Sequence, residues 1–230
     1  MIDNAHPIAL YLTDNWFIYP WLTKHQQQVV LSFAERFCDE TEFWFTPSIV
    51  PSEELAWLVA ANAALVGGAQ ATNCFAGVRW VYLVGDDAFD GELSGDARGH
   101  STVRINAFDL VEESQERISG QQIAIHEFAH VLDALFGITD STPALRDALE
   151  LHLENRRNGI EDIIPDVVFE TMVEQNTREE FFSYVSEIFF TDPHGILNFY
   201  PPLYNDLVAI YGLNLAKQLP DLNAEAINTK

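Results

Sequence analysis

The chain has 230 residues, of which 48% are hydrophobic, so a sizeable core can be buried and disorder is not expected. Lysine and arginine total 12 against 35 aspartates and glutamates, which gives a formal net charge of −23. Such a charge repels phosphate backbones and anionic lipid heads, so we expect no nucleic-acid partner and no membrane partner. A basic peptide would be attracted, although plain solubility is the simpler interpretation of the charge.

The first half of the chain carries both helical and strand patterns. Apolar residues recur at helical spacing over 26–37, and Ser52 can cap a second helix that follows it. Residues 78–84 predict a strand, whereas 85–99 are rich in Asp and Gly and predict a loop. Alternation over 102–106 predicts a second strand. By analogy with related folds, this strand could be the sheet edge on which a peptide lies by β-addition.

Helical patterns dominate the second half of the chain. The clearest helix covers 119–136, because Ser119 can cap its N-terminus and Gly137 stands where a left-handed residue is favoured after its end. Further helices are predicted at 145–153, 177–190 and 203–211. Many helices and a few strands around one site predict an α+β domain.

A metal-binding pattern lies inside the clearest helix. Residues 126–130 read His-Glu-Phe-Ala-His and fit the pattern His-Glu-x-x-His. Residues four apart share one helix face, so His126 and His130 can both bind one zinc ion at about 2.0–2.1 Å. Glu127 can then take a proton from a zinc-bound water and pass it to the leaving amine. The alternative is two surface histidines and a solvated glutamate on an amphipathic helix.

A catalytic zinc ion needs a third protein ligand and one open position. No third histidine follows closely, since Phe136 occupies the position where a distal histidine would stand. Glu180 and Glu187 share one face of the helix predicted at 177–190, and their spacing does not choose between them. Glu180 has a competing interpretation, because Thr177-x-x-Glu180 is also a capping box in which the glutamate binds only a backbone N–H.

Two runs of sequence resemble the Mlc titration factor A family of zinc metallopeptidases. They are the His126–Asp133 run, His-Glu-Phe-Ala-His-Val-Leu-Asp, and the Glu180–Phe190 run, Glu-Phe-Phe-Ser-Tyr-Val-Ser-Glu-Ile-Phe-Phe. The segment 200–211 is similar to the C-terminal pattern of that family, and the likeness extends from about Pro51 to Leu215. The resemblance implies a zincin-like fold, mainly helical with a small sheet. We therefore divide the chain into an N-terminal helical segment, 1–50, packed on a catalytic domain, 51–230.

The resemblance also implies which residues act. In this family, as in the anthrax lethal factor protease domain, the third ligand is the glutamate immediately before a Phe-Phe pair. That implies His126, His130 and Glu180 as zinc ligands, with Glu127 as the general base. The activity implied is that of an aminopeptidase-like peptidase acting on a peptide or protein. The alternative implied is a zinc-containing regulatory protein that captures a transcriptional regulator with little or no catalysis.

The sequence departs from the family pattern at two places. The tyrosine that the family has seven residues before the glutamate ligand, where it steadies the oxyanion, is Val173 here. Tyr184, one turn beyond Glu180, could take its place. The family segment Gly-Glu-Ala-Trp reads Gly-Asp-Ala-Arg over 95–98. These departures bear on substrate range and rate, and they do not touch the three implied ligands.

Two further residues have open roles. Asp133 could accept the second N–H of a ligand histidine, or it could be an exposed helix aspartate. His100 could reach the site, but a loop histidine without a role is the simpler interpretation.

The expected compartment follows from what the sequence lacks. The two cysteines, Cys38 and Cys74, form no Cys-x-x-Cys pair and no disulfide framework, so we expect free thiols in a reducing compartment. Neither a signal-peptide pattern nor a run of 18 apolar residues occurs. We therefore expect a cytoplasmic protein.

Overall fold

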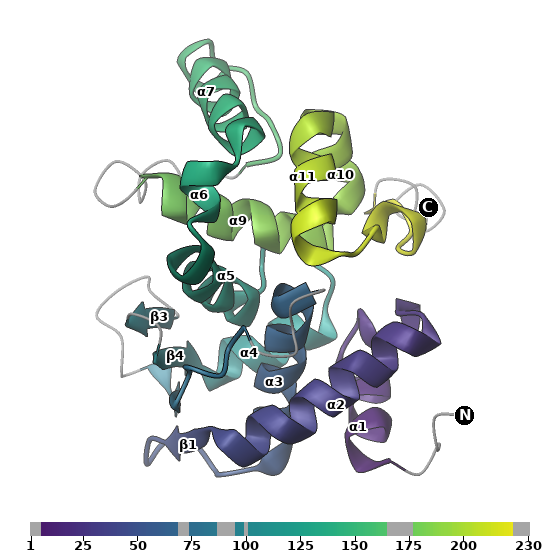
Figure 1. Cartoon of the computed structure of the whole chain (residues 1–230), viewed down its shortest axis with the longest axis vertical. Coiled ribbons are helices and arrows are strands. Elements are labelled where there is room, and N and C mark those ends of the chain that lie inside the picture. Colours follow the sequence, from purple (N-terminus) through teal and green to yellow (C-terminus); the bar gives the residue numbers. More distant parts are fainter. Residues whose placement is uncertain (1–5, 69–73, 87–94, 99–100, 165–176, 223–230) are drawn as a thin grey trace.

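The computed structural model describes residues 6–68, 74–86, 95–98, 101–164 and 177–222, and helices dominate this part of the chain (Figure 1). The predicted α+β class is confirmed, with one small sheet beside the helices. The elements, in chain order, are α1 (Pro7–Asn15), η1 (Tyr19–Trp21), α2 (Lys24–Glu40), β1 (Glu42–Phe45), α3 (Glu53–Gly67), β2 (Trp80–Val84), β3 (Gly95–Arg98), β4 (Thr102–Asn106), α4 (Ala107–Gln115), α5 (Ile123–Phe136), α6 (Ile138–Ser141), α7 (Pro143–Arg157), α9 (Thr177–Thr191), α10 (Pro193–Phe199), α11 (Pro201–Tyr211) and η4 (Leu215–Lys217).

The four described strands form one mixed sheet in the order β1-β2-β4-β3. The strands β1, β2 and β4 run parallel, and β3 runs antiparallel to β4. Because β4 is paired on both sides, the expectation that 102–106 form the sheet edge is wrong; among the described strands that edge is β3. The loop predicted over 85–99 is wrong for Gly95–Arg98 as well. A four-residue segment with Gly and Asp has no local strand signal, and its pairing with β4 makes it a strand.

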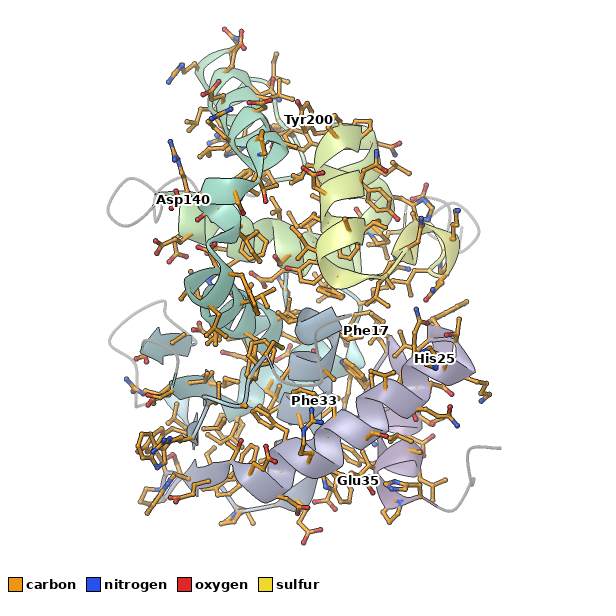
Figure 2. The ribbon with its side chains drawn as sticks, in the orientation of Figure 1. Phe17, His25, Phe33, Glu35, Asp140 and Tyr200 are labelled. Carbon is orange, nitrogen blue, oxygen red and sulfur yellow. The ribbon has the colours of Figure 1, made fainter. Side chains whose placement is uncertain are left out.

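The helix α5 lies at the centre of the fold, between the sheet and α3 on one side and α9 on the other (Figure 1). Its Phe128 is fully buried, and the ring centroid lies 5.9 Å from that of Phe37 on α2 and 5.0 Å from that of Phe75. Side chains fill the space between these elements, including Phe33 on α2, whose ring stacks on Phe37 (Figure 2). The N-terminal helices therefore share one core with α5, and a boundary at residue 50 stays a prediction.

The two ends of α5 differ in how well the sequence predicted them. The helix begins at Ile123 and not at Ser119, because Gly120 has a φ of +71° that no right-handed helix accommodates. Gly137 ends it with a φ of +62°, so the predicted left-handed glycine is confirmed. Among the described residues, no helix combines the length and the apolar character needed to cross a bilayer.

The substitution Phe128→Ala tests whether α2 and α5 share one core. Removing this buried ring leaves a cavity between Phe37 and Phe75, and we expect the free energy of unfolding to fall by about 3–5 kcal/mol in urea titrations. The exposed ring of Phe108 on α4 is the matched control, and its replacement by alanine should change stability by less than about 1 kcal/mol. Equal effects of the two substitutions would contradict a shared core.

Candidate metal centre

Two helices supply the residues of the candidate metal centre, which we define as His126, His130 and Glu180. His126 and His130 lie one turn apart on α5, and Glu180 lies in the first turn of α9. The two helices pack directly against each other. The side chains of the three residues are largely buried, with exposed fractions of 12%, 21% and 15%. Residues 50 positions apart in the sequence are thus brought to one point.

The geometry of this centre fits a metal ion. The two Nε2 atoms of His126 and His130 are 3.1 Å apart, and each lies 3.4 Å from one carboxylate oxygen of Glu180. A tetrahedral ion with bonds of about 2.0–2.1 Å separates its ligand atoms by about 3.3–3.4 Å. Two imidazoles with one carboxylate are also a donor set that suits zinc. The three side chains could therefore hold such an ion without large rearrangement.

The structure separates the two glutamates between which spacing could not choose. Glu180 faces both Nε2 atoms, whereas Glu187 lies on the other side of the His126 ring. The Nδ1–H of His126 donates to Oε1 of Glu187 at 2.8 Å, and the backbone N–H of Gln122 donates to Oε2 at 2.7 Å. A histidine that donates through Nδ1 keeps the Nε2 lone pair free for a metal. The capping-box interpretation of Glu180 depends on the Thr177 side chain, which lies outside the described residues.

The half-buried side chain of Glu113, on α4, also binds the start of α5. Its Oε2 accepts the backbone N–H of Ile123 at 2.5 Å, and its backbone carbonyl accepts the side-chain amide of Gln122. Burial, together with the charge of Glu187, raises the pKa of Glu113 to about 8, against the lowering effect of the Ile123 bond. The predicted cap from Ser119 is therefore wrong, since carboxyl groups from α4 and α9 do this work. Nothing local in the sequence marks Glu113 for this role.

Glu127 lies beside the centre and is 3% exposed. Its Oε2 has no hydrogen-bond partner among the described residues. Burial raises the pKa of Glu127 to about 8; the charge of His126 lowers it, and the carboxylates of Glu180 and Asp96 raise it. The backbone of Gly95 on β3 covers this carboxylate, because a Cβ built at Gly95 would come within 2.5 Å of Oε1. Only glycine fits there without moving Glu127, a constraint that the Asp- and Gly-rich sequence did not reveal.

The charges around His126 and its burial shift its pKa in opposite directions. Burial lowers the pKa of His126, but hydrogen bonds to Glu180 and Glu187 outweigh this and raise it well above its usual value. For Glu180 the balance is reversed, since burial raises its pKa and the bonds from His126 and His130 lower it well below its usual range. The surroundings of His126 therefore favour positive charge at this point of the protein.

The structure describes two of the other residues with predicted roles, Asp133 and Tyr184. Asp133 is buried, and its carboxylate accepts the backbone N–H of Thr139 at 2.7 Å and the hydroxyl of Thr139 at 2.9 Å. It therefore holds the start of α6, and both interpretations of it from sequence are wrong. The Tyr184 ring packs edge-on against His126 with 4.9 Å between ring centroids. Val173 and His100 lie outside the described residues.

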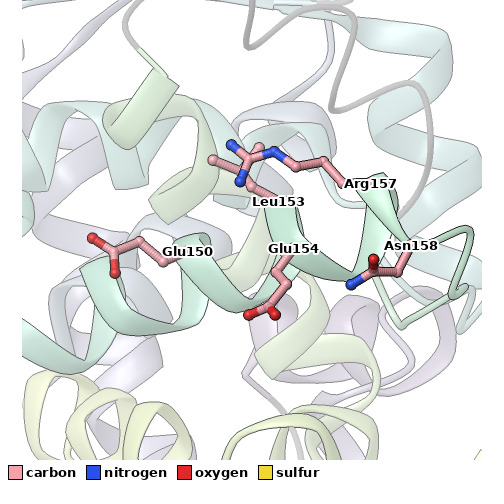
Figure 3. Close-up of a pocket in the computed structure, with 5 residues that line it drawn as sticks. All are labelled: Glu150, Leu153, Glu154, Arg157 and Asn158. Atoms are coloured by element: carbon pink, nitrogen blue, oxygen red, sulfur yellow. The ribbon is translucent and has the colours of Figure 1, made fainter.

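A separate surface feature lies on α7. A pocket of about 520 Å³ follows one face of this helix (Figure 3). Its lining residues are Glu150, Leu153, Glu154, Arg157 and Asn158. It shares no residue with the candidate metal centre.

A helical domain with a small mixed sheet, and with two histidines and a glutamate converging from two packed helices, defines a zincin-like metallopeptidase fold. The sequence matches the family described as glucose-regulated metallo-peptidase M90 over residues 5–212, and the chain belongs to that family. This is the family that Mlc titration factor A represents, so the resemblance seen in the sequence is confirmed. No curated protein sequence matches the chain closely enough to count as a relative.

The substitution Gly95→Ala tests whether β3 positions the Glu127 carboxylate. A methyl group at position 95 would lie only 2.5 Å from Oε1 of Glu127 and would displace that oxygen. We therefore expect peptide hydrolysis to fall by at least about 100-fold. The three atoms nearest to this methyl group all belong to Glu127, so metal content should be unchanged. Full activity in Gly95→Ala would show that Glu127 tolerates the displacement.

The pH dependence of stability tests the raised pKa of Glu113. Between its ordinary value of 4.5 and about 8, the folded protein keeps a proton that the unfolded chain has lost. Stability should therefore fall as pH rises through this window, by up to about 1.4 kcal/mol per pH unit from this group. Urea titrations of metal-free Glu113→Gln should show a shallower fall, since glutamine does not titrate. Glu112→Gln, the exposed neighbour, should follow the unsubstituted protein, and parallel profiles for all three would contradict the shift.

Proposed function

We propose that this protein is a zinc-dependent peptidase in which His126, His130 and Glu180 hold the ion and Glu127 is the general base. The observation that carries the proposal is the convergence of three side chains, with the two Nε2 atoms 3.1 Å apart and each 3.4 Å from one carboxylate oxygen of Glu180, and with the buried carboxylate of Glu127 next to them. A bound zinc ion acidifies a coordinated water and polarises the carbonyl of the scissile bond. Membership of a metallopeptidase family supports hydrolysis of peptide bonds as the reaction.

The role proposed for Glu127 follows from its surroundings. An unpartnered carboxylate oxygen in a buried site is free to accept a proton from the attacking water and to deliver it to the leaving amine. Its raised pKa favours the protonated state, and a dication nearby lowers that pKa toward the ionised form that a base requires. Gly95 limits the positions that the carboxylate can take.

A peptide substrate is proposed to lie along β3. This strand ends the described sheet, so one row of its backbone groups has no strand partner among the described residues, and an extended peptide can pair with it. Gly95 places this edge next to Glu127. Aminopeptidase-like action on free N-termini is the finer proposal. It is supported by the family resemblance and by the acidic surroundings, which attract an α-ammonium group.

The decisive variant is Glu127→Gln, assayed with amino-acid anilides and peptide mixtures on the zinc-loaded protein. Glutamine keeps the shape of the side chain but cannot take up a proton, so we expect turnover to fall by at least about 100-fold with zinc content unchanged. Glu150→Gln on α7, an exposed residue outside the metal centre, is the matched control and should keep full activity.

Two results would contradict the proposal. One is an unsubstituted, zinc-loaded protein that cleaves no peptide, and the other is Glu127→Gln with full activity. Either result would favour the alternative of a zinc-containing protein that captures a transcriptional regulator. That alternative stays a prediction. The cytoplasmic location also stays a prediction. That Tyr184 takes over the role of the tyrosine that the family has at the position of Val173 also stays a prediction. The packing of the Tyr184 ring against His126 supports it.

A further inference from the structure

We propose that Glu187 is a positioning residue that prepares His126 for metal binding by accepting two hydrogen bonds at once. The inference rests on the proposed metal centre and adds a residue that does not touch the ion. Glu187 is 5% exposed and lies seven residues after Glu180 on α9. One helix therefore supplies both a candidate ligand and the group that orients another ligand.

The two bonds hold different parts of α5. Oε1 accepts Nδ1–H of the His126 ring at 2.8 Å, which leaves Nε2 of that ring directed at Glu180 and His130. Oε2 accepts the backbone N–H of Gln122 at 2.7 Å, which satisfies a donor that no residue of the helix can pair. The ring and the start of the helix are thus fixed by one carboxylate.

Only a carboxylate can do both tasks. Both of its oxygens accept hydrogen bonds, and the two partners, Nδ1–H of His126 and the N–H of Gln122, are both donors. A glutamine at position 187 has one oxygen and one NH₂ group. Its NH₂ group would face either the Gln122 donor, which is repulsive, or Nδ1 of His126, which moves the ring proton to Nε2 and blocks metal binding.

Bonds from Thr191, the last residue of α9, support the same arrangement. Its hydroxyl donates to the carbonyl of Glu187 at 2.7 Å and accepts the backbone N–H of Gly120 at 2.9 Å. The guanidinium Nε of Arg117 donates to the Thr191 carbonyl at 2.7 Å. The turn that leads into α5 is therefore attached to α9 before any metal binds, so ordering of His126 need not be driven by the ion.

The test compares zinc affinity, by chelator competition, in the unsubstituted protein, Glu187→Gln and Glu113→Gln. We expect Glu187→Gln to bind zinc about 10- to 100-fold more weakly. Glu113→Gln is the matched control: its amide oxygen can still accept the N–H of Ile123, and it never contacts His126, so affinity should stay within about threefold. Circular dichroism and urea unfolding check that the variants are folded.

A spectroscopic readout separates positioning from a general structural role. In the zinc-loaded unsubstituted protein, the Nδ1 proton of His126 should be protected from exchange and shifted far downfield in the ¹H NMR spectrum by its carboxylate partner. Glu187→Gln should move or broaden this signal, and Glu113→Gln should not. If Glu187→Gln does not fold, the Nδ1 proton signal of His126 in the unsubstituted protein still tests the role of Glu187.

The outcomes for this inference and for the proposed function differ. If the unsubstituted protein binds no zinc, the proposed function fails. If it binds zinc and Glu187→Gln binds equally tightly, or if the protected Nδ1 proton is absent from the unsubstituted protein, the role of Glu187 is overturned while the metal centre stands.

Discussion

The packing of α5 against α9 is the constraint on which the rest of the site depends. One face of α9 is wholly apolar and fully buried, and its burial sets how the helix is rotated about its axis. The residues of this face are Phe181, Phe182, Val185, Ile188 and Phe189. With that rotation set, Glu180 and Glu187 both turn toward α5, one to each side of the His126 ring. A hydrophobic interaction therefore determines the placement of two charged groups that do not take part in it.

Burying these carboxylates is costly, and the arrangement of α5 offsets that cost in a specific way. The N-terminus of a helix carries partial positive charge and unpaired N–H groups. Glu113 and Glu187 bind those groups directly, and Glu180 lies against two imidazoles. The buried Oε2 of Glu127 has no hydrogen-bond partner among the described residues. The lowered pKa of Glu180 and the raised pKa of His126 both show that this point favours a positive charge, in agreement with the spacing of the ligand atoms.

The sequence predicted the parts of the site that depend on local geometry. His126, Glu127 and His130 lie within two turns of one helix, and the period of 3.6 residues is enough to place the two histidines on one face with Glu127 beside them. The same period placed Glu180 and Glu187 together on the face opposite the phenylalanines. It could not choose between them, because the choice depends on how two helices cross, and no local pattern encodes that. The family resemblance, and not spacing, selected Glu180.

The errors have the same origin. Ser119 has the right side chain for a cap, but Gly120 breaks the helix and carboxyl groups distant in sequence take over. The segment 95–98 has the composition of a loop, and pairing with β4 makes it a strand. Both errors concern features that neighbours in space impose on a segment with weak local preference.

Side chains alternate between the two faces of β3, and this alternation shows how one departure from the family pattern, Asp96 in place of Glu, lies relative to the site. Side chains on a strand point to opposite faces in turn, so Gly95 and Ala97 share one face and Asp96 lies on the other. Gly95 contacts the Glu127 carboxylate, and Ala97 packs against the core. Asp96 instead accepts a 2.7 Å ion-pair bond from Arg104 on β4. The change of Glu to Asp at this position therefore lies on the face of the strand away from the base. The change keeps the negative charge, and the charge of Asp96 raises the pKa of the Glu127 carboxyl.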